Sequence, residues 1–259
     1  MKIYGLTDRG AVREINEDSI GILSLPGGFT VAVVCDGMGG AAGGRTASEI
    51  AVETFMESVV TELSALVTKD VKGIKRALDT SIASANSAIF EYALIHKELR
   101  GMGCTLNAVV YSKELSRLCF ANVGDSRLYM INKKEIKQLS KDHSFVQYLV
   151  DTGEITPEEA ESHPQKNLIT RAVGIDTEVE ADIFYIKLPQ KRQLFFLLCS
   201  DGLHGLVSSE DMKKIALGEQ SIEGKVFSLI RAANDAGGDD NVSAILLQIN
   251  EKDGEVSAR

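Results

Sequence analysis

The sequence predicts an α+β fold in which antiparallel β-strands form the centre and helices pack outside them. Strand-like segments come in runs and helical segments come in pairs. This grouping disfavours a doubly wound parallel sheet, in which strands and helices alternate. A length of 259 residues allows one large domain, and 44% apolar residues allow an ample core. We therefore expect a folded α+β protein and not a disordered chain.

The first hundred residues contain three strand-like segments and two long helical patterns. The strands are expected at residues 3–7, 19–24 and 29–35. Apolar residues then recur at helical spacing from Ala47 to Val67, and again from Ile74 to Tyr92. Gly101 is expected to end this helical region.

The rest of the chain returns to strands before it closes with two helices and a final strand. Strands are expected at residues 105–111, 116–123, 127–131, 135–139, 178–188, 194–199 and 242–249, and helices at 209–216 and 222–236. Ser144 to Gln147 fits a capping box that opens a short helix ending near Gly153. Residues 156–174 are polar and predict an irregular excursion. We expect one domain over residues 1–250, followed by a polar tail over residues 251–259.

Composition excludes several classes of function. The chain has 28 Lys and Arg against 37 Asp and Glu, and its net charge of −9 disfavours a nucleic-acid partner. The sequence contains no run of about 18 apolar residues, so we expect no membrane-spanning segment. The first residues lack the pattern of a signal peptide. The four cysteines are scattered and form no Cys-x-x-Cys, which suits a reducing compartment. We therefore expect a cytoplasmic protein in which any metal is held by oxygen.

Four acidic clusters lie at the ends of strand-like segments or in Gly-rich turns. They are residues 13–18, 36–40, 200–202 and 237–241. Asp36 and Asp201 each follow a strongly apolar segment, where an ionised carboxylate is costly unless it is paired or binds a cation. Carboxylates from distant segments, without histidines or thiolates, are typical ligands of Mg²⁺ or Mn²⁺. The alternative is that each Asp-Gly pair simply forms a turn.

An ordered series of short motifs runs through nearly the whole chain. It comprises Thr7-Asp8-Arg9-Gly10-Ala11-Val12-Arg13 with Asn16-Glu17-Asp18, Asp36-Gly37-Met38-Gly39-Gly40, Gly103-Cys104-Thr105, Asn122-Val123-Gly124-Asp125-Ser126-Arg127, Asp142-His143-Ser144, Arg171-Ala172-Val173-Gly174, Ser200-Asp201-Gly202-Leu203 and Asp240-Asn241-Val242-Ser243. In this order, the motifs resemble the metal-dependent Ser/Thr protein phosphatases of the type 2C family in their compact bacterial form. One such motif is weak evidence, but the ordered series is specific.

The resemblance implies a central sandwich of two antiparallel sheets flanked by pairs of antiparallel helices. It also implies a binuclear Mn²⁺ or Mg²⁺ centre at one end of the sandwich. Asp36 would bridge the two ions, and the backbone carbonyl of Gly37 would bind one of them. Asp201 and Asp240 would bind the other ion.

The resemblance assigns further roles around this centre. Glu17 and Asp18 would hold metal-bound waters or accept hydrogen bonds around the ligands. Asp125, together with Asp201, resembles the ligand pair of a weaker third ion found in bacterial members. Arg13 would bind the substrate phosphate, because its planar fork suits bidentate contact.

The expected reaction follows from the charge of the ions. Two close divalent ions lower the pKa of a shared water, so a bridging hydroxide can attack phosphorus directly near neutral pH. No phosphoenzyme is then expected. Eukaryotic members carry His where this chain has Met38, which cannot donate a proton. The leaving oxygen would be protonated either by a water on a third ion at Asp125, or by bulk water with Met38 as a packing residue.

Other polar and sulfur-containing side chains near the motifs are expected to be structural. His143 stands at an expected helix start, which favours capping or packing over catalysis. His204 follows the Asp201 cluster, where a structural role beside the site is also favoured. Cys35 and Cys199 lie in apolar strands and are expected to be small buried hydrophobic residues.

The resemblance also implies a flap beside the active site at residues 144–171. Its polar composition predicts a mobile loop that helps to select phosphoproteins, with an ordinary surface insertion as the alternative. The expected function is hydrolysis of phosphoserine and phosphothreonine by a monomer that opposes a bacterial Ser/Thr protein kinase. One rival is a catalytically dead relative that binds phosphoproteins. The other is a phosphatase of small phosphometabolites, which a deep closed pocket would favour.

Overall fold

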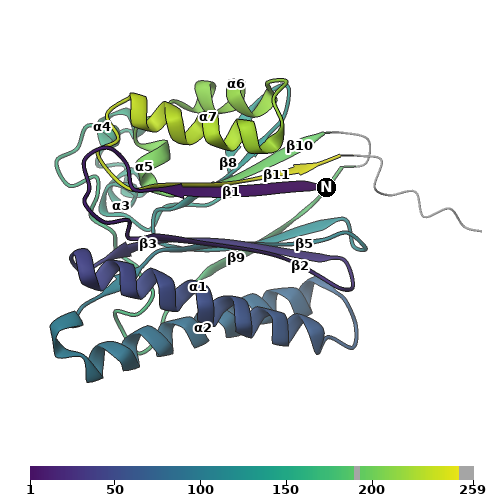
Figure 1. The fold of residues 1–259 in the computed structure, drawn as a ribbon, viewed down its shortest axis with the longest axis horizontal. Coiled ribbons are helices and arrows are strands. Elements are labelled where there is room, and N and C mark those ends of the chain that lie inside the picture. The colour runs from purple at the N-terminus through teal and green to yellow at the C-terminus, as the bar shows by residue number, and fades with distance from the viewer. Residues whose placement is uncertain (190–192, 251–259) are drawn as a thin grey trace, which may run out of the picture.

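The computed structural model describes residues 1–189 and 193–250, which form two antiparallel β-sheets packed face to face (Figure 1). The first sheet contains, in spatial order, β1 (Lys2–Asp8), β11 (Val242–Ile249), β10 (Leu194–Cys199), β7 (Arg127–Ile131) and β8 (Ile136–Gln138). The second contains β2 (Asp18–Leu25), β3 (Phe29–Met38), β5 (Leu106–Ser112), β6 (Arg117–Val123) and β9 (Asp182–Lys187), and β4 (Gly103–Cys104) pairs with β3. The expected polar tail, 251–259, lies outside the described residues.

Helices cover the outer face of each sheet (Figure 1). The second sheet is covered by α1 (Ala41–Ser64) and α2 (Val71–Ile95), and the first by α5 (Asp201–His204), α6 (Ser209–Leu217) and α7 (Ile222–Asp235). The predicted α+β sandwich with flanking helices is therefore confirmed. No helix in the described part of the chain is long and apolar enough to cross a membrane.

Three apolar layers hold the sandwich together. Phe55 and Leu78 pack between the α1–α2 pair and the second sheet, and Phe120 packs between the two sheets. Along β10, Phe195 faces the helices on the first sheet, whereas Phe196 faces the second sheet. Because both faces of β10 are buried, its sequence is continuously apolar and does not alternate with polar residues.

The strand register brings the acidic clusters to one end of the sandwich. Asp18 at the start of β2 pairs with Asp36 in β3. Cys199 at the end of β10 pairs with Ala244 near the start of β11, which places the segments before and after these residues at the same edge. A carboxylate oxygen of Asp18 accepts a hydrogen bond at 2.7 Å from the hydroxyl of Ser200, which joins the two sheets at this end.

Two of the predicted strands differ from the structure by more than one residue at an end. The third predicted strand continues past Cys35, because Thr105 extends the hydrogen bonding to Asp36. The Thr105 amide donates to the Asp36 carbonyl at 2.8 Å, and the Asp36 amide donates to the Thr105 hydroxyl at 2.9 Å. The strand predicted from residue 178 begins at Asp182.

The segment predicted as irregular contains a short helix, α4 (Pro157–Glu161). Thr156 and Glu159 form a reciprocal capping box at its start. The capping box predicted for α3 (Phe145–Thr152) is only half present: Ser144 accepts from the Gln147 amide, but the Gln147 side chain donates to Asp151. As predicted, α3 ends at Gly153.

Candidate active site

The predicted carboxylates act on one another electrostatically at one end of the sandwich. Burial raises the pKa of Asp36 well above its usual range, and the negative charges of Asp18 and Asp201 raise it further. Asp125 and Asp240 act on Asp36 in the same direction. The structure therefore brings together five acidic side chains that lie in five separate regions of the sequence.

Asp201 lies at the first position of α5, directly after β10. Burial and the neighbouring charge of Asp240 raise its pKa, whereas a side-chain hydrogen bond with Asp36 lowers it. The sequence analysis expected no helix between residues 199 and 209, but α5 places Asp201 in the first turn of a short helix. Gly202 is required there, because a Cβ would collide with the backbone carbonyl of Asn241.

Two carboxylate oxygens in this cluster are buried without a hydrogen-bond partner, Oδ1 of Asp18 and Oε1 of Glu17. The other Asp18 oxygen accepts at 2.7 Å from the hydroxyls of both Ser200 and Ser243. Burial raises the pKa of Asp18 to about 7. Burial also raises the pKa of Glu17, whereas the positive charge of the nearby Arg13 guanidinium lowers it. Buried polar atoms without partners, among carboxylates that repel one another, fit a site for cations.

The donor set fits hydrated divalent cations better than a cage made only of protein. Among residues 1–189 and 193–250, no group of three or more Asp, Glu, His or Cys side chains is arranged as a complete metal site. Mg²⁺ typically keeps several waters and binds through one or two carboxylates, and Mn²⁺ also prefers oxygen ligands. An incomplete set of carboxylates with unpaired oxygens is thus compatible with such ions.

Arg13 lies at the exposed rim of this cluster. Its guanidinium Nη2 lies 2.8 Å from Asp240 Oδ2, and Nη1 lies 4.0 Å from Glu17 Oε2. The Arg13 side chain is 47% exposed and that of Asp240 is 36% exposed. A planar cation is therefore accessible from solvent beside the acidic cluster.

Asp125 lies in the turn between β6 and β7 and is 8% exposed. Burial raises its pKa to about 7, and the charges of Asp201 and Asp142 act in the same direction. His204 Nε2 lies 3.1 Å from the Asp125 backbone oxygen. Burial lowers the pKa of His204 to about 3, so the imidazole is neutral and donates this hydrogen bond.

His143 is also buried and forms hydrogen bonds within the fold. Its Nδ1 accepts from the Gly124 amide at 3.2 Å, and its Nε2 lies 3.3 Å from Arg171. Burial lowers its pKa, and the Arg171 charge adds to this effect. The cap of α3 is Ser144, so His143 packs beside the helix start and does not cap it. Cys35 and Cys199 are free and buried, as expected.

Sequence reasoning assigned no role to four polar residues that hold the acidic side chains or their backbone. Thr105 bonds the backbone of Asp36, and Ser200 and Ser243 bond Asp18. Asn241 is hydrogen-bonded to the loop that carries Arg13 and Glu17. All four stand in the motifs that carried the family resemblance, which was the only signal for them in the sequence.

The predicted flap is fastened at both of its ends. The Thr170 amide donates to the His143 carbonyl at 2.8 Å, and the Phe145 amide donates to the Leu168 carbonyl, also at 2.8 Å. Arg171 lies 3.2 Å from Asp182 at the start of β9. Residues 144–171 thus leave and rejoin the fold within a short distance, close to the turn that carries Asp125.

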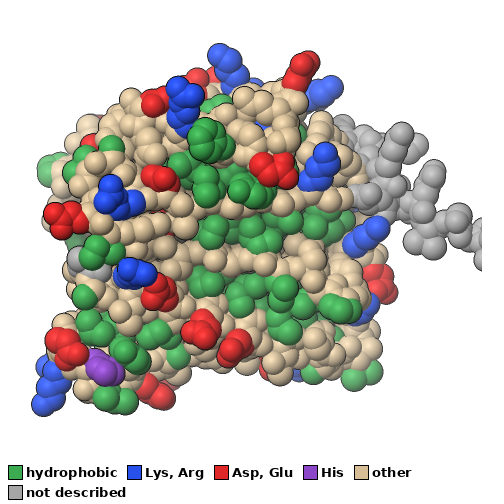
Figure 2. Space-filling view, viewed as in Figure 1, with side chains coloured by type: hydrophobic (Ala, Val, Ile, Leu, Met, Phe, Trp, Pro, Cys, Tyr) green, Lys and Arg blue, Asp and Glu red, His purple; other side chains and the backbone are tan. Residues whose placement is uncertain are grey.

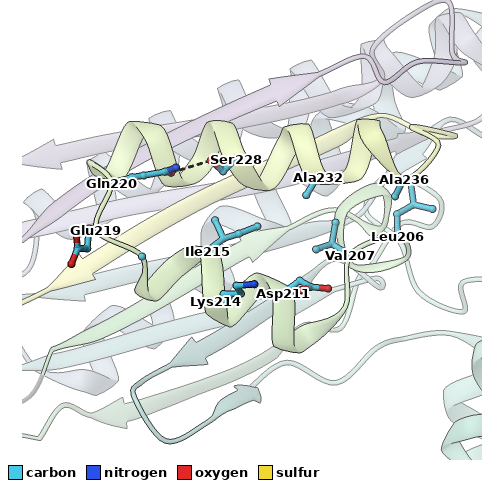
Figure 3. A pocket seen from close by; sticks show the side chains of 11 residues that line it. Leu206, Val207, Asp211, Lys214, Ile215, Glu219, Gln220, Ser228, Ala232 and Ala236 are labelled. Carbon is cyan, nitrogen blue, oxygen red and sulfur yellow. Dashed lines mark hydrogen bonds between the residues drawn. The ribbon is translucent and has the colours of Figure 1, made fainter.

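A cavity of about 510 Å³ lies elsewhere, between α6 and α7 (Figure 3). Ile215, Val207 and Ala232 line it, and a hydrogen bond of 2.9 Å joins Ser228 to Gln220 at its edge. None of the predicted site residues lines this cavity. The acidic cluster is thus separate from it.

Comparisons with known proteins agree with this architecture. Residues 9–245 match the family model described as protein phosphatase 2C. The chain is 39% identical over 244 residues to a serine/threonine phosphatase stp of Listeria welshimeri, with 94% of each chain covered. These matches define a phosphoprotein phosphatase.

Two solved structures share the fold. A serine/threonine phosphatase PstP/Ppp of Mycobacterium tuberculosis has a TM-score of 0.83 at 34% identity, with 96% of this chain and 98% of that one covered. The catalytic domain of PstP in complex with two manganese ions has a TM-score of 0.79 at 32% identity, with 96% and 98% covered. The chain belongs to the protein phosphatase 2C family.

Proposed function

We propose that the acidic end of the sandwich holds a binuclear Mn²⁺ or Mg²⁺ centre, where phosphoserine and phosphothreonine are hydrolysed by direct attack on phosphorus. The observation that carries this proposal is the convergence of five buried or half-buried carboxylates beside the accessible cation of Arg13. The related catalytic domain that binds two manganese ions supports the kind and the number of metals.

Four residues would hold the two ions. Asp36 would contact both, and the Gly37 carbonyl one of them, while Asp201 and Asp240 would hold the other. When bound, such ions supply a hydroxide nucleophile near neutral pH and neutralise charge on the phosphoryl oxygens. The pKa shifts that burial and repulsion cause among these carboxylates support their role as ligands, because a cation would relieve both effects.

The surrounding side chains would orient the substrate and the water. Arg13 would bind the phosphate through its guanidinium fork. Glu17 and Asp18 each present one unpartnered oxygen, which would accept hydrogen bonds from waters on the ions. Asp125 and Asp201 would hold a third, weaker ion. Such an ion would make a nearby water acidic enough to protonate the leaving oxygen, which Met38 cannot do.

We propose phosphoproteins and not small phosphometabolites as substrates, because the site is open at Arg13 and Asp240. Residues 144–171 would act as a substrate-selecting flap on a single domain of residues 1–250. On the face in Figure 2, Lys and Arg are interspersed with Asp and Glu, which gives no basic track for nucleic acid. We also propose a cytoplasmic monomer, without a membrane or nucleic-acid partner, that opposes a bacterial Ser/Thr protein kinase.

The test is phosphate release from a phosphothreonine protein and from p-nitrophenyl phosphate, with Mn²⁺ added and then removed by EDTA. We expect metal-dependent turnover, with a higher kcat/KM on the phosphoprotein. A folded chain that binds the phosphoprotein but releases no phosphate at any Mn²⁺ or Mg²⁺ concentration would contradict the proposal. A higher kcat/KM on the small ester would contradict the substrate class alone.

A further inference from the structure

We propose that Asn241 is a positioning residue, which places Arg13 by fastening both ends of the loop that carries it. We call residues 9–17 the Arg13 loop. The inference rests on the proposed phosphate-binding role of Arg13. It adds that the loop is held in place by one buried amide side chain, which comes from the other end of the sequence.

Asn241 makes three hydrogen bonds to the backbone of the Arg13 loop. Its Nδ2 donates to the carbonyl of Arg9 at 2.8 Å and to that of Ile15 at 2.9 Å. Its Oδ1 accepts from the amide of Glu17 at 2.8 Å. Asn241 is only 4% exposed, and an amide is a side chain that offers two donors and an acceptor together.

The segment before Asn241 fastens the middle of the same loop. The amides of Ala11 and Val12 donate to the Gly238 carbonyl at 2.9 and 3.2 Å. Gly10 has a φ of 79°, and a Cβ there would collide with the Asp240 carbonyl. The Arg13 loop therefore rests on residues 238–241 over most of its length.

The Arg13 side chain is 47% exposed, so packing of the side chain does little to fix its position. Arg13 therefore depends for its position on the backbone of its loop. Its 2.8 Å contact is with Asp240, the residue directly before Asn241. The same short segment thus sets the guanidinium and its carboxylate partner relative to each other. Without the Asn241 amide, two carbonyls and one amide of the loop lose their hydrogen bonds, and the loop can move away from the acidic cluster.

The test is a double-mutant cycle on the Mn²⁺-loaded full chain, with inorganic phosphate binding measured by calorimetry. We expect N241A and R13A each to weaken phosphate binding about tenfold, because small displacements of a binding group have large effects. If Asn241 acts through Arg13, the double variant binds phosphate within about twofold of R13A. Mn²⁺ binding, titrated separately, should change less than about twofold in N241A.

Asn86 provides the matched control. It is 1% exposed, accepts from the Gly174 amide at 2.7 Å and donates to the Asp176 carbonyl at 2.9 Å. N86A should lower the melting temperature but leave phosphate affinity unchanged. If N241A does not fold, N241S, which keeps a small polar group, takes its place in the cycle.

Two results would overturn the inference while leaving Arg13 in its role. One is multiplication of the N241A and R13A effects in the double variant. The other is an equal loss of Mn²⁺ and phosphate affinity in N241A, which would mean that Asn241 acts through Asp240. If R13A itself bound phosphate as tightly as the wild type, the proposed role of Arg13 would fail, and the inference with it.

Discussion

The guanidinium of Arg13 lies 2.8 Å from the carboxylate of Asp240, although 227 residues separate the two in the chain. Both side chains are partly exposed, so the pair itself contributes little to stability. Its importance is positional. It places a planar cation where a phosphate group that enters the acidic cluster would meet it.

Replacing Arg13 should separate its charge from its geometry. We expect R13A to lower kcat/KM on a phosphothreonine peptide by roughly 10- to 150-fold, the size of a lost charge-assisted hydrogen bond of about 1.5–3 kcal/mol. R13K keeps the charge but loses the fork, so it should restore only part of the activity. Steady-state kinetics at saturating Mn²⁺ measure both variants. Full activity in R13K would show that the charge alone matters.

The pH dependence of stability should report the buried Asp18. Burial raises its pKa from 3.8 to about 7 in the metal-free protein. Between these values the folded state binds more protons than the unfolded state, so the contribution of Asp18 to stability falls as the pH rises. D18N removes this contribution. Its free energy of unfolding relative to the wild type should therefore rise by about 2–3 kcal/mol from pH 5 to pH 8.

Urea unfolding in EDTA at each pH gives this difference directly. His143 and His204 have lowered pKa values and contribute with the opposite sign below about pH 6.5, but they are present in both proteins and cancel. A difference that stays flat from pH 5 to pH 8 would mean that Asp18 titrates as an ordinary carboxyl group.

His204 should not be the general acid. Its pKa of about 3 leaves it neutral throughout the working range, and its Nε2 is occupied by the Asp125 carbonyl. We expect H204Q to keep the shape of the pH–rate profile and to lose less than about tenfold in kcat, whereas removal of a general acid would cost about 10²- to 10⁴-fold. The loss of one limb of the profile would contradict this assignment.

Asp125 should be needed for turnover but not for the binding of the two tighter ions. If a water acidified by a third ion protonates the leaving oxygen, D125A should lower kcat by about 10²-fold even at saturating Mn²⁺. Calorimetry should show two Mn²⁺ sites retained and a weaker one lost. Unchanged kcat in D125A would contradict the third-ion proposal and favour protonation by bulk water.

The layers of the fold could be predicted from the sequence because apolar periodicity records burial. The stripe of α2 and the continuous apolar segment of β10 show this, since both are dominated by contacts with one or two neighbouring layers. Strand ends were less predictable. Asp36 and Gly37 belong to types that are rare in strands, yet β3 continues through them, because the backbone and hydroxyl of Thr105 provide partners that local sequence does not reveal.

In the candidate site, too, local sequence features could be predicted, whereas contacts between distant segments could not. Asp36 and Asp201 could be singled out because a carboxylate beside an apolar strand is unusual. The partner of Arg13 and the support from Asn241 could not, because both depend on the β1–β11 pairing that joins the two ends of the chain. The short helices α4 and α5 were missed because segments of four or five residues carry too little periodicity.

The measurement that tests the metal-dependent phosphatase most directly is phosphate release from a phosphothreonine peptide as Mn²⁺ is titrated and then chelated. It compares the native chain with D36N and with D79N, which changes an exposed Asp on α2. We predict metal-dependent turnover in the native chain and in D79N. In D36N we predict that turnover falls at least about 10³-fold, and that calorimetry shows weaker Mn²⁺ binding at the two sites. Equal turnover in D36N and the native chain, or turnover that survives complete chelation, would contradict the account.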